Sequence, residues 1–252
     1  MTTPSSAPHP LDISEPPGSS GSSRGDTPAA VPAPYGPHGA RDRADGSPRP
    51  GLFKAVYADP PWTPQQTSRL GAASHYPLMS TQRILDMGPA IQEITADQSF
   101  CFLWVTTATV ETGFAVLRAW GYRYVSYYFW AKPRISLGNT FRNAGELLLL
   151  GVRGKGTTVA FHSQPNWGFH PLQEHSHKPE EVHQIIERLV GGDGPFLELF
   201  ARRAAPSNKH WDIWGNECDA TISLAQWGYP IPSDHTPTRH QAEEPSREEG
   251  SK

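Results

Sequence analysis

The stretch that decides the fold is Leu52-Phe53-Lys54-Ala55-Val56-Tyr57-Ala58-Asp59-Pro60-Pro61-Trp62. Its first seven residues are mostly apolar, which is typical of a strand covered on both faces of an α/β sheet. The two prolines that follow Asp59 lack the N–H group that a strand needs for its hydrogen bonds. The chain therefore leaves the sheet at Asp59. In open α/β folds ligands bind just beyond the carboxyl ends of strands, so we predict a ligand site at residues 59–62.

The residue types at this position favour a planar base that carries an amino group. The Asp59 carboxylate and a proline carbonyl are acceptors for the two amino hydrogens of adenine, and Trp62 offers a flat ring beside the base. Holding both hydrogens would direct the nitrogen lone pair towards an electrophile. The alternative interpretation is structural, because Asp and Pro are ordinary turn residues and Trp62 can simply close the core.

Strand-like and helix-like segments alternate along the rest of the chain. Continuous apolar runs predict strands, and apolar residues at helical spacing predict helices whose ends carry Ser80, Gly121, Pro179 and Gly191 as start and stop signals. The predicted strands are 52–58, 99–105, 124–131, 146–151, 195–200 and 211–214, and the predicted helices are 80–87, 110–120 and 179–190. This order predicts an α/β fold with a mostly parallel central sheet and helices on both faces.

Composition divides the chain into three parts. Residues 1–50 contain 11 of the 26 prolines and few large apolar residues, so we expect a disordered arm. Residues 51–220 are long enough for one domain with its own core. Residues 221–252 contain several prolines and an acidic end, and we expect a largely disordered tail.

Charge and cysteine content narrow the function only slightly. Residues 51–217 hold 15 Lys and Arg against 14 Asp and Glu, which neither demands nor excludes a nucleic-acid substrate. Cys101 and Cys218 do not suggest a disulfide framework, so a reducing cytoplasm is expected. The histidines at 162, 170, 175 and 177 lack a compact ligand spacing, and no metal is predicted. No signal peptide or membrane-spanning run is recognised.

Five further residues are candidates for binding. Tyr76 lies in a long polar loop after residue 62 and can face a base, although a packed surface tyrosine is the alternative. Lys132 and Arg142 lie in a basic segment at a strand end, which suits phosphate or is a solvated turn. Glu146 opens an apolar strand, so we place it at the mouth of the site. Lys178 stands at a helix start and suits an anionic group, unless it is only solvated.

Several motifs in one order resemble a known family. They are Tyr57-Ala58-Asp59-Pro60-Pro61-Trp62, Phe102-Leu103-Trp104-Val105, Ser176-His177-Lys178-Pro179-Glu180-Glu181, Glu198-Leu199-Phe200-Ala201-Arg202 and Gly215-Asn216-Glu217. Over about residues 52–217 the chain resembles the MT-A70 family of adenine N6-methyltransferases. That family includes the catalytic subunit that methylates adenosine in messenger RNA, and prokaryotic and phage members linked to DNA adenine methylation.

The resemblance implies a Rossmann-like fold with S-adenosylmethionine as the methyl donor. It implies that the catalytic motif is Asp59, Pro60, Pro61 and Trp62, and that Glu146 lies near the bound nucleoside. Donor-binding residues would be Asp59, Lys178, Arg202, Asn216 and Glu217. The implied substrate is adenine in DNA, more than in RNA, and a partner subunit or a homodimer is possible. Three alternatives stay open: methylation of a free nucleoside or nucleotide, nucleic-acid binding without catalysis, and a scaffold whose disordered arms recruit partners.

The chain also departs from the family pattern near the donor site. Ala201 stands where glycine is familiar, Arg203-Ala204-Ala205 lacks the His-Asn of the messenger-RNA enzyme, and Glu217 stands where glutamine can occur. An upstream Asp-Ile pair that contacts the donor in the messenger-RNA enzyme has no counterpart in the proline-rich arm.

Overall fold

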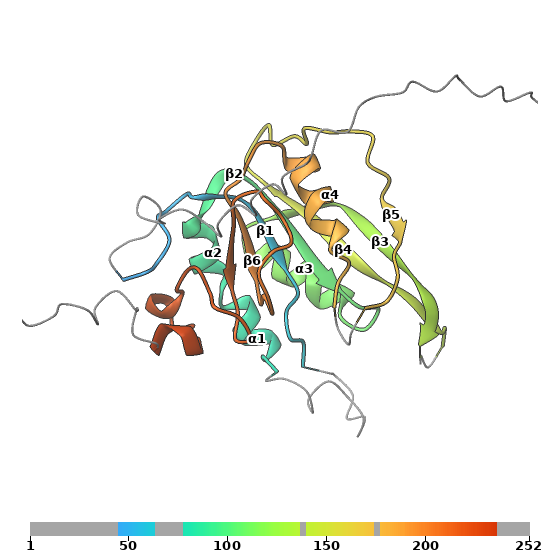
Figure 1. Cartoon of the computed structure of the whole chain (residues 1–252), viewed down its shortest axis with the longest axis horizontal. Helices are drawn as coiled ribbons and strands as arrows, with labels where there is room; N and C mark the ends of the chain where they lie inside the picture. Colours follow the sequence, from blue (N-terminus) through green and yellow to red (C-terminus); the bar gives the residue numbers. More distant parts are fainter. Residues whose placement is uncertain (1–44, 64–77, 137–139, 174–176, 236–252) are drawn as a thin grey trace, which may run out of the picture. The chain divides into compact units, whose positions relative to one another are not determined.

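The computed structural model describes residues 45–63, 78–136, 140–173 and 177–235, and Figure 1 shows the arrangement of its elements. The elements in chain order are β1 (Phe53–Ala58), α1 (Thr81–Leu85), α2 (Gly88–Ile94), β2 (Thr95–Val105), α3 (Val110–Ala119), β3 (Arg123–Ser136), β4 (Asn143–Arg153), β5 (Trp167–Phe169), α4 (Glu181–Val190), β6 (Phe196–Leu199) and β7 (Trp211–Trp214). Two 3-10 turns, Ala225–Trp227 and Pro232–His235, follow β7.

The strands form one seven-stranded sheet in the order β5-β3-β4-β2-β1-β6-β7. The pairs β1–β2, β1–β6, β6–β7 and β3–β5 are parallel, whereas β4 runs antiparallel to both β2 and β3. The α/β class and the mostly parallel sheet are therefore confirmed, with one antiparallel strand inside a mixed sheet. The strand that carries the Asp-Pro-Pro-Trp motif, β1, has neighbours on both sides.

Helices cover both faces of the sheet, as predicted (Figure 1). On one face Ile91 of α2 and Leu117 of α3 pack into a cluster with side chains of β1, β2 and β6. On the other face Val182 and Ile186 of α4 pack against the opposite side chains of the same strands. Because successive strand residues point to opposite faces, the continuous apolar runs of β1 and β2 supply both clusters.

The predicted helix signals act at three of four positions. Ser80 caps α1 by accepting a hydrogen bond from the Arg83 N–H at 3.2 Å. Gly121 (φ +84°) and Gly191 (φ +75°), each just after a helix, have the positive φ that glycine adopts readily. The fourth signal is misplaced, because α4 begins at Glu181 and Pro179 precedes it.

Two elements and a domain boundary differ from the sequence-based expectations. Neither helix α2 nor strand β5 was predicted. Residues 222–231 pack into the domain rather than forming a tail, since Ile222, Leu224, Tyr229 and Ile231 are buried in the core. The Arg83 guanidinium also donates to the Gly228 carbonyl at 2.7 Å. Among the described residues, no helix has the length and apolar character needed to span a membrane.

Candidate active site

Asp59 lies directly after β1, at the carboxyl edge of the parallel part of the sheet. Its side chain is 32% exposed, and its Oδ2 atom lies 2.6 Å from the Nζ atom of Lys178. Lys178 belongs to the segment that precedes α4, so two distant parts of the sequence meet at this ion pair. The sequence-based expectation that both residues belong to one site is consistent with this geometry.

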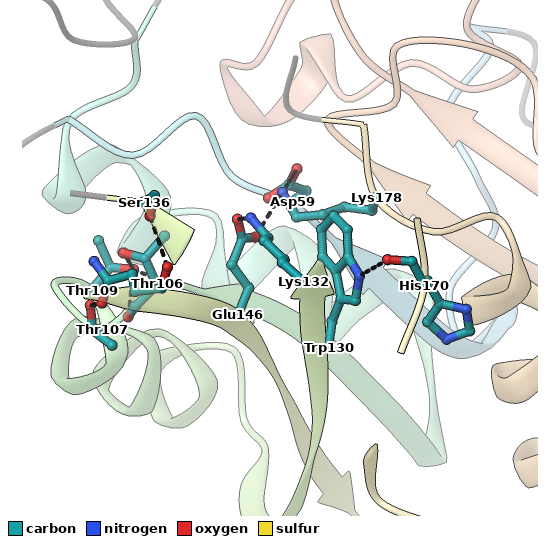
Figure 2. Close-up of polar contacts among 11 residues, drawn as sticks. Asp59, Thr106, Thr107, Thr109, Trp130, Lys132, Ser136, Glu146, His170 and Lys178 are labelled. Carbon is teal, nitrogen blue, oxygen red and sulfur yellow. Dashed lines mark hydrogen bonds and ion pairs between the residues drawn. The ribbon is translucent and has the colours of Figure 1, made fainter. Parts of the chain in front are cut away.

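A row of alternating charges extends from this pair. Lys178 Nζ is 3.3 Å from Glu146 Oε2, and Glu146 Oε1 accepts a hydrogen bond from Lys132. Glu146 lies on β4 and Lys132 on β3, and Figure 2 shows the four side chains converging. We call Asp59, Lys178, Glu146 and Lys132 the charged row. The two inner residues of the row, Lys178 and Glu146, each have an opposite charge on both sides. These attractions offset the free-energy cost of removing the charged groups from water.

Burial and the neighbouring charges shift the pKa values within the charged row. Burial raises the pKa of Asp59, and the carboxylate of Glu146 adds to this although Lys178 opposes it. Burial alone would raise the pKa of Glu146, but the ammonium groups of Lys178 and Lys132 bring it below the ordinary value. Burial alone would lower the pKa of Lys178, but Asp59 and Glu146 raise it well above the ordinary value. Lys178 and Glu146 therefore stay charged, and Asp59 is the member that most readily accepts a proton.

The two lysines of the charged row each lie over an indole ring. Lys178 Nζ lies 5.6 Å from the centre of the Trp104 ring, and Lys132 Nζ lies 4.5 Å from the centre of the Trp130 ring. These distances allow cation–π attraction, which is stronger away from bulk water. Trp62 is joined to the same group, since its Nε1 atom donates to the Trp104 carbonyl at 3.2 Å. The position of the Trp62 ring is thus fixed before any ligand binds.

The proline carbonyls expected to face a ligand already accept one hydrogen bond each. The Pro60 carbonyl accepts from the Trp62 N–H at 2.8 Å, and the Pro61 carbonyl accepts from the Met79 N–H at 3.0 Å. A carbonyl oxygen has two lone pairs, so each retains one site for a further donor. The bonds make the turn rigid and hold it against the start of α1.

A cavity of about 280 Å³ opens beside Asp59, between the ends of β1, β6 and β7. Its volume is close to the lower end for small-ligand sites, about 300 Å³. All five predicted donor-binding residues line it, namely Asp59, Lys178, Arg202, Asn216 and Glu217. The Arg202 guanidinium and the Glu217 carboxylate form an ion pair at 3.0 Å across its wall.

The backbone is tightly packed on the β6 and β7 side of this cavity. A Cβ atom on Gly215 would lie 1.9 Å from the Ala201 carbonyl oxygen, so only glycine fits there. Phe200, another lining residue, has φ of +62°, a conformation that costs free energy for a residue with a side chain. The buried Nε1 atom of Trp214 finds no hydrogen-bond partner within the described part of the chain. This donor is fully buried behind the cavity wall.

The predicted substrate-binding residues do not all lie at the cavity. Glu146, predicted at the mouth of the site, contacts Lys178, which lines the cavity. Lys132, predicted to meet phosphate or to lie in a solvated turn, is paired with Glu146. Arg142 is exposed on the connection between β3 and β4 and does not line the cavity. Tyr76 lies outside the described residues. Among the described residues, no group of three or more metal-ligating side chains is placed to bind a metal ion.

Two aromatic residues of the site were missed by sequence reasoning. The Trp104 ring lies beside Lys178, and Trp214 lines the cavity. Both lie inside apolar strands, where a sequence pattern cannot distinguish a core tryptophan from one at a site.

A cavity at the carboxyl edge of parallel strands, with acceptors, a cation and aromatic walls, defines an α/β protein that binds a small polar ligand. The MT-A70 family profile matches residues 53–217. The chain is 33% identical over 180 residues to the N(6)-adenosine-methyltransferase MT-A70-like protein of Drosophila melanogaster, covering 67% of this chain and 27% of that protein. It is 32% identical over 179 residues to the N(6)-adenosine-methyltransferase catalytic subunit METTL3 of Homo sapiens, covering 67% and 29% respectively. The N(6)-adenine-specific methyltransferase METTL4 of Homo sapiens is 26% identical over 184 residues, covering 66% and 37%.

The chain belongs to the MT-A70 family. It spans less than a third of the length of the two most similar relatives named above. MT-A70 methyltransferases use S-adenosylmethionine, and the residues at the cavity fit this group. An ammonium group suits its carboxylate, and carboxylate and amide groups suit its hydroxyl and amino groups.

Proposed function

We propose that this protein transfers a methyl group from S-adenosylmethionine to the 6-amino group of adenine in nucleic acid, with DNA as the preferred polymer. One observation carries the proposal. The Asp-Pro-Pro-Trp turn projects from the central strand β1 into the same cavity that Lys178, Arg202, Asn216 and Glu217 line. Family membership supports the reaction, and the family's prokaryotic and phage members linked to DNA methylation support the preference for DNA.

The residues of the turn have separate tasks in this reaction. Asp59 accepts one amino hydrogen of adenine, and the second lone pair of the Pro60 carbonyl accepts the other. Together they direct the nitrogen lone pair into the cavity, and Trp62 borders the ring. When bound, S-adenosylmethionine supplies an electrophilic methyl group on its sulfonium. Asp59 stays hydrogen-bonded to the amino group, which releases its extra proton once the nitrogen is methylated.

The remaining residues of the cavity hold the donor. Lys178 is the cation nearest to Asp59, and it serves a donor carboxylate while its place in the charged row keeps it protonated. Arg202, Asn216 and Glu217 stand at the β6 and β7 side of the cavity and supply hydrogen bonds to the ribose and adenine groups of the donor.

The test measures transfer of labelled methyl to duplex DNA, single-stranded DNA, RNA and free adenosine, followed by digestion to nucleosides and mass analysis. Wild-type protein should form N6-methyladenine in DNA. Asp59→Ala should abolish transfer while donor affinity changes little, because Glu146 still neutralises Lys178 in that variant. Asp97→Ala, an exposed aspartate near the start of β2, is the matched control and should behave as wild type. Normal turnover by Asp59→Ala would contradict the assigned role, and label on adenosine alone would move the substrate to a free nucleoside.

A further inference from the structure

Positive charge is concentrated in one part of the sequence. Residues 112–173, which include β3, β4 and β5, contain seven Lys and Arg residues and a single carboxylate, Glu146. The rest of residues 51–217 contains eight Lys and Arg against thirteen Asp and Glu. Glu146 is only 17% exposed and is paired with two lysines, so it does little to neutralise the surface. Arg134 and Arg142, at the β3–β4 connection, are exposed. These two arginines, in the segment that follows Lys132 and precedes Glu146, therefore supply exposed positive charge beside the charged row.

The exposed aromatic residues gather in the same region. Every large apolar side chain that is exposed among the described residues lies between Tyr124 and Leu172. Trp167 is 60% exposed and Phe169 is 63% exposed, although both belong to strand β5. Strand β5 is at the edge of the sheet (Figure 1). Side chains of this size are normally buried, so their exposure at one edge indicates a binding surface.

Strand register shows that these rings share one face. Phe129 pairs with Trp167 and Ala131 pairs with Phe169, so Tyr127, Phe129, Trp167 and Phe169 point to the same side. Gly168 faces the other side, where an added Cβ would lie 1.9 Å from the Tyr128 hydroxyl oxygen. We call Tyr127, Trp167 and Phe169, the three exposed members of this set, the aromatic edge.

The aromatic edge is connected to the candidate active site through the sheet. Gly168 pairs with Trp130, and Trp130 pairs with Glu146 of the charged row. At the usual strand spacing, Gly168 is about 10 Å from Glu146. Glu146, Trp130 and Gly168 share the face opposite to the aromatic edge. A polymer that places one base at Asp59 therefore reaches the aromatic edge by passing over β5, the edge strand of the sheet.

We propose that the aromatic edge binds single-stranded nucleic acid, with bases stacked on Trp167 and Phe169 and phosphates held by exposed arginines such as Arg134 and Arg142. Every base has a flat face, so stacking on two exposed rings tolerates any sequence. This inference deepens the proposed function, because it names the strandedness of the polymer and the surface that holds it beside the target adenine.

Charge favours a polyanion over a second copy of the chain on this surface. Two copies meeting through the aromatic edge would bring like-charged surfaces together, which opposes association. A single strand supplies both complementary features, since its phosphates are negative and its bases are free to stack. In a duplex the bases are already stacked on each other, so the rings have no free face to contact.

The first experiment measures binding of a fluorescent single strand of about 12 nucleotides, a length within the usual range for such surfaces. DNA and RNA versions and the matching duplex are compared, all without methyl donor. Trp167→Ala with Phe169→Ala should weaken single-strand binding at least about tenfold and leave duplex binding unchanged. Phe161→Ala is the matched control, because Phe161 is an exposed aromatic that lies instead beside Arg188 of α4. All three side chains are exposed, so the variants should fold normally.

A second experiment tests the charges. Each phosphate contact on a single strand contributes about 0.7 to the slope of log affinity against log salt, so Arg134→Ala with Arg142→Ala should reduce that slope by about 1.4. Lys54→Ala, on β1, is the control and should leave the slope unchanged.

The outcomes separate this inference from the proposed function. Unchanged single-strand affinity in the Trp167→Ala, Phe169→Ala variant, or no single-strand binding by wild type at low salt, overturns the inference. Sedimentation showing a wild-type dimer that this variant dissociates would also overturn it, because the aromatic edge would then be an interface between copies. If wild type transfers methyl and the variant has an unchanged KM for single strands, only the inference fails. If wild type binds single strands through these rings but transfers no methyl, only the proposed function fails.

Discussion

Lys178 is the residue on which the geometry of the site depends most. It lies between two carboxylates, Asp59 at 2.6 Å and Glu146 at 3.3 Å, and only Glu146 has a second cation in the charged row. Removing the ammonium group leaves Asp59 facing Glu146 with like charge. The charged row therefore acts as a unit, and its members cannot be exchanged independently.

Lys178→Met should lower the free energy of unfolding by about 2 kcal/mol, less than for a fully buried pair because Asp59 is 32% exposed. Urea denaturation at pH 7 measures this. Adding Asp59→Asn should restore part of the loss, because it removes the carboxylate left without its cation. Lys155→Met, at an exposed lysine, is the control. A Lys178→Met protein as stable as wild type would show that the row contributes nothing to folding.

Activity should depend on the ionisation of Asp59, because only its carboxylate accepts the amino hydrogen. The pKa of Asp59 is raised, so activity should fall with decreasing pH earlier than for an ordinary aspartate. Glu146→Gln removes the negative charge of Glu146, a charge that raises the pKa of Asp59. In this variant Asp59 is the only carboxylate of the charged row that remains paired with Lys178. The acid side of the kcat/KM profile should therefore move to lower pH in this variant.

The same pH profile has an internal control in Glu111→Gln, an exposed glutamate on α3. Its acid side should coincide with that of wild type. If Glu146→Gln moves the acid side to higher pH, or leaves it in place, then Asp59 is not the group that titrates.

At the scale of single elements, the sequence predicted most strands and helices because their apolar patterns are continuous. The antiparallel β4 was not predicted from its own pattern, since an apolar run has no direction. The predicted strands 124–131 and 146–151 left residues 132–145 between them, long enough for a parallel crossover, which needs about a dozen residues. The strands in fact extend to Ser136 and from Asn143, and the connection that remains is too short for a crossover. Strand β5 has only three residues, and its pairing with β3 depends on tertiary contacts rather than on any period.

The C-terminal segment was misplaced for a related reason. Ile222, Leu224, Tyr229 and Ile231 are separated by turns, so they show neither helical nor strand spacing, and the nearby prolines suggested a tail. The residues predicted to bind the donor could be selected from the sequence because they sit in short motifs, and they line one cavity. Its aromatic supports, Trp104 and Trp214, could not be distinguished from core residues.

Leu224 gives a direct test of the corrected boundary. It is fully buried against the cluster that contains α2 and α3, so Leu224→Ala should lower the free energy of unfolding by about 3 kcal/mol. Gln226→Ala, two residues further and exposed, should change it little. Equal stability of the two variants would show that residues 222–231 do not belong to the folded domain.

For the whole molecule, the core defines which residues the fold requires. All the buried core side chains of the described residues lie between Phe53 and Ile231, and Ser47 is also buried. We therefore predict that a chain of residues 45–235 unfolds at the same temperature as the full chain and binds S-adenosylmethionine with similar affinity. A chain of residues 45–220 is the matched comparison, because it keeps every residue of the cavity but lacks Ile222, Leu224, Tyr229 and Ile231. It should be strongly destabilised or insoluble. Thermal unfolding and donor titration of the three chains would decide the matter, since a 45–235 chain that melts well below the full chain would assign a structural role to residues 1–44 or 236–252.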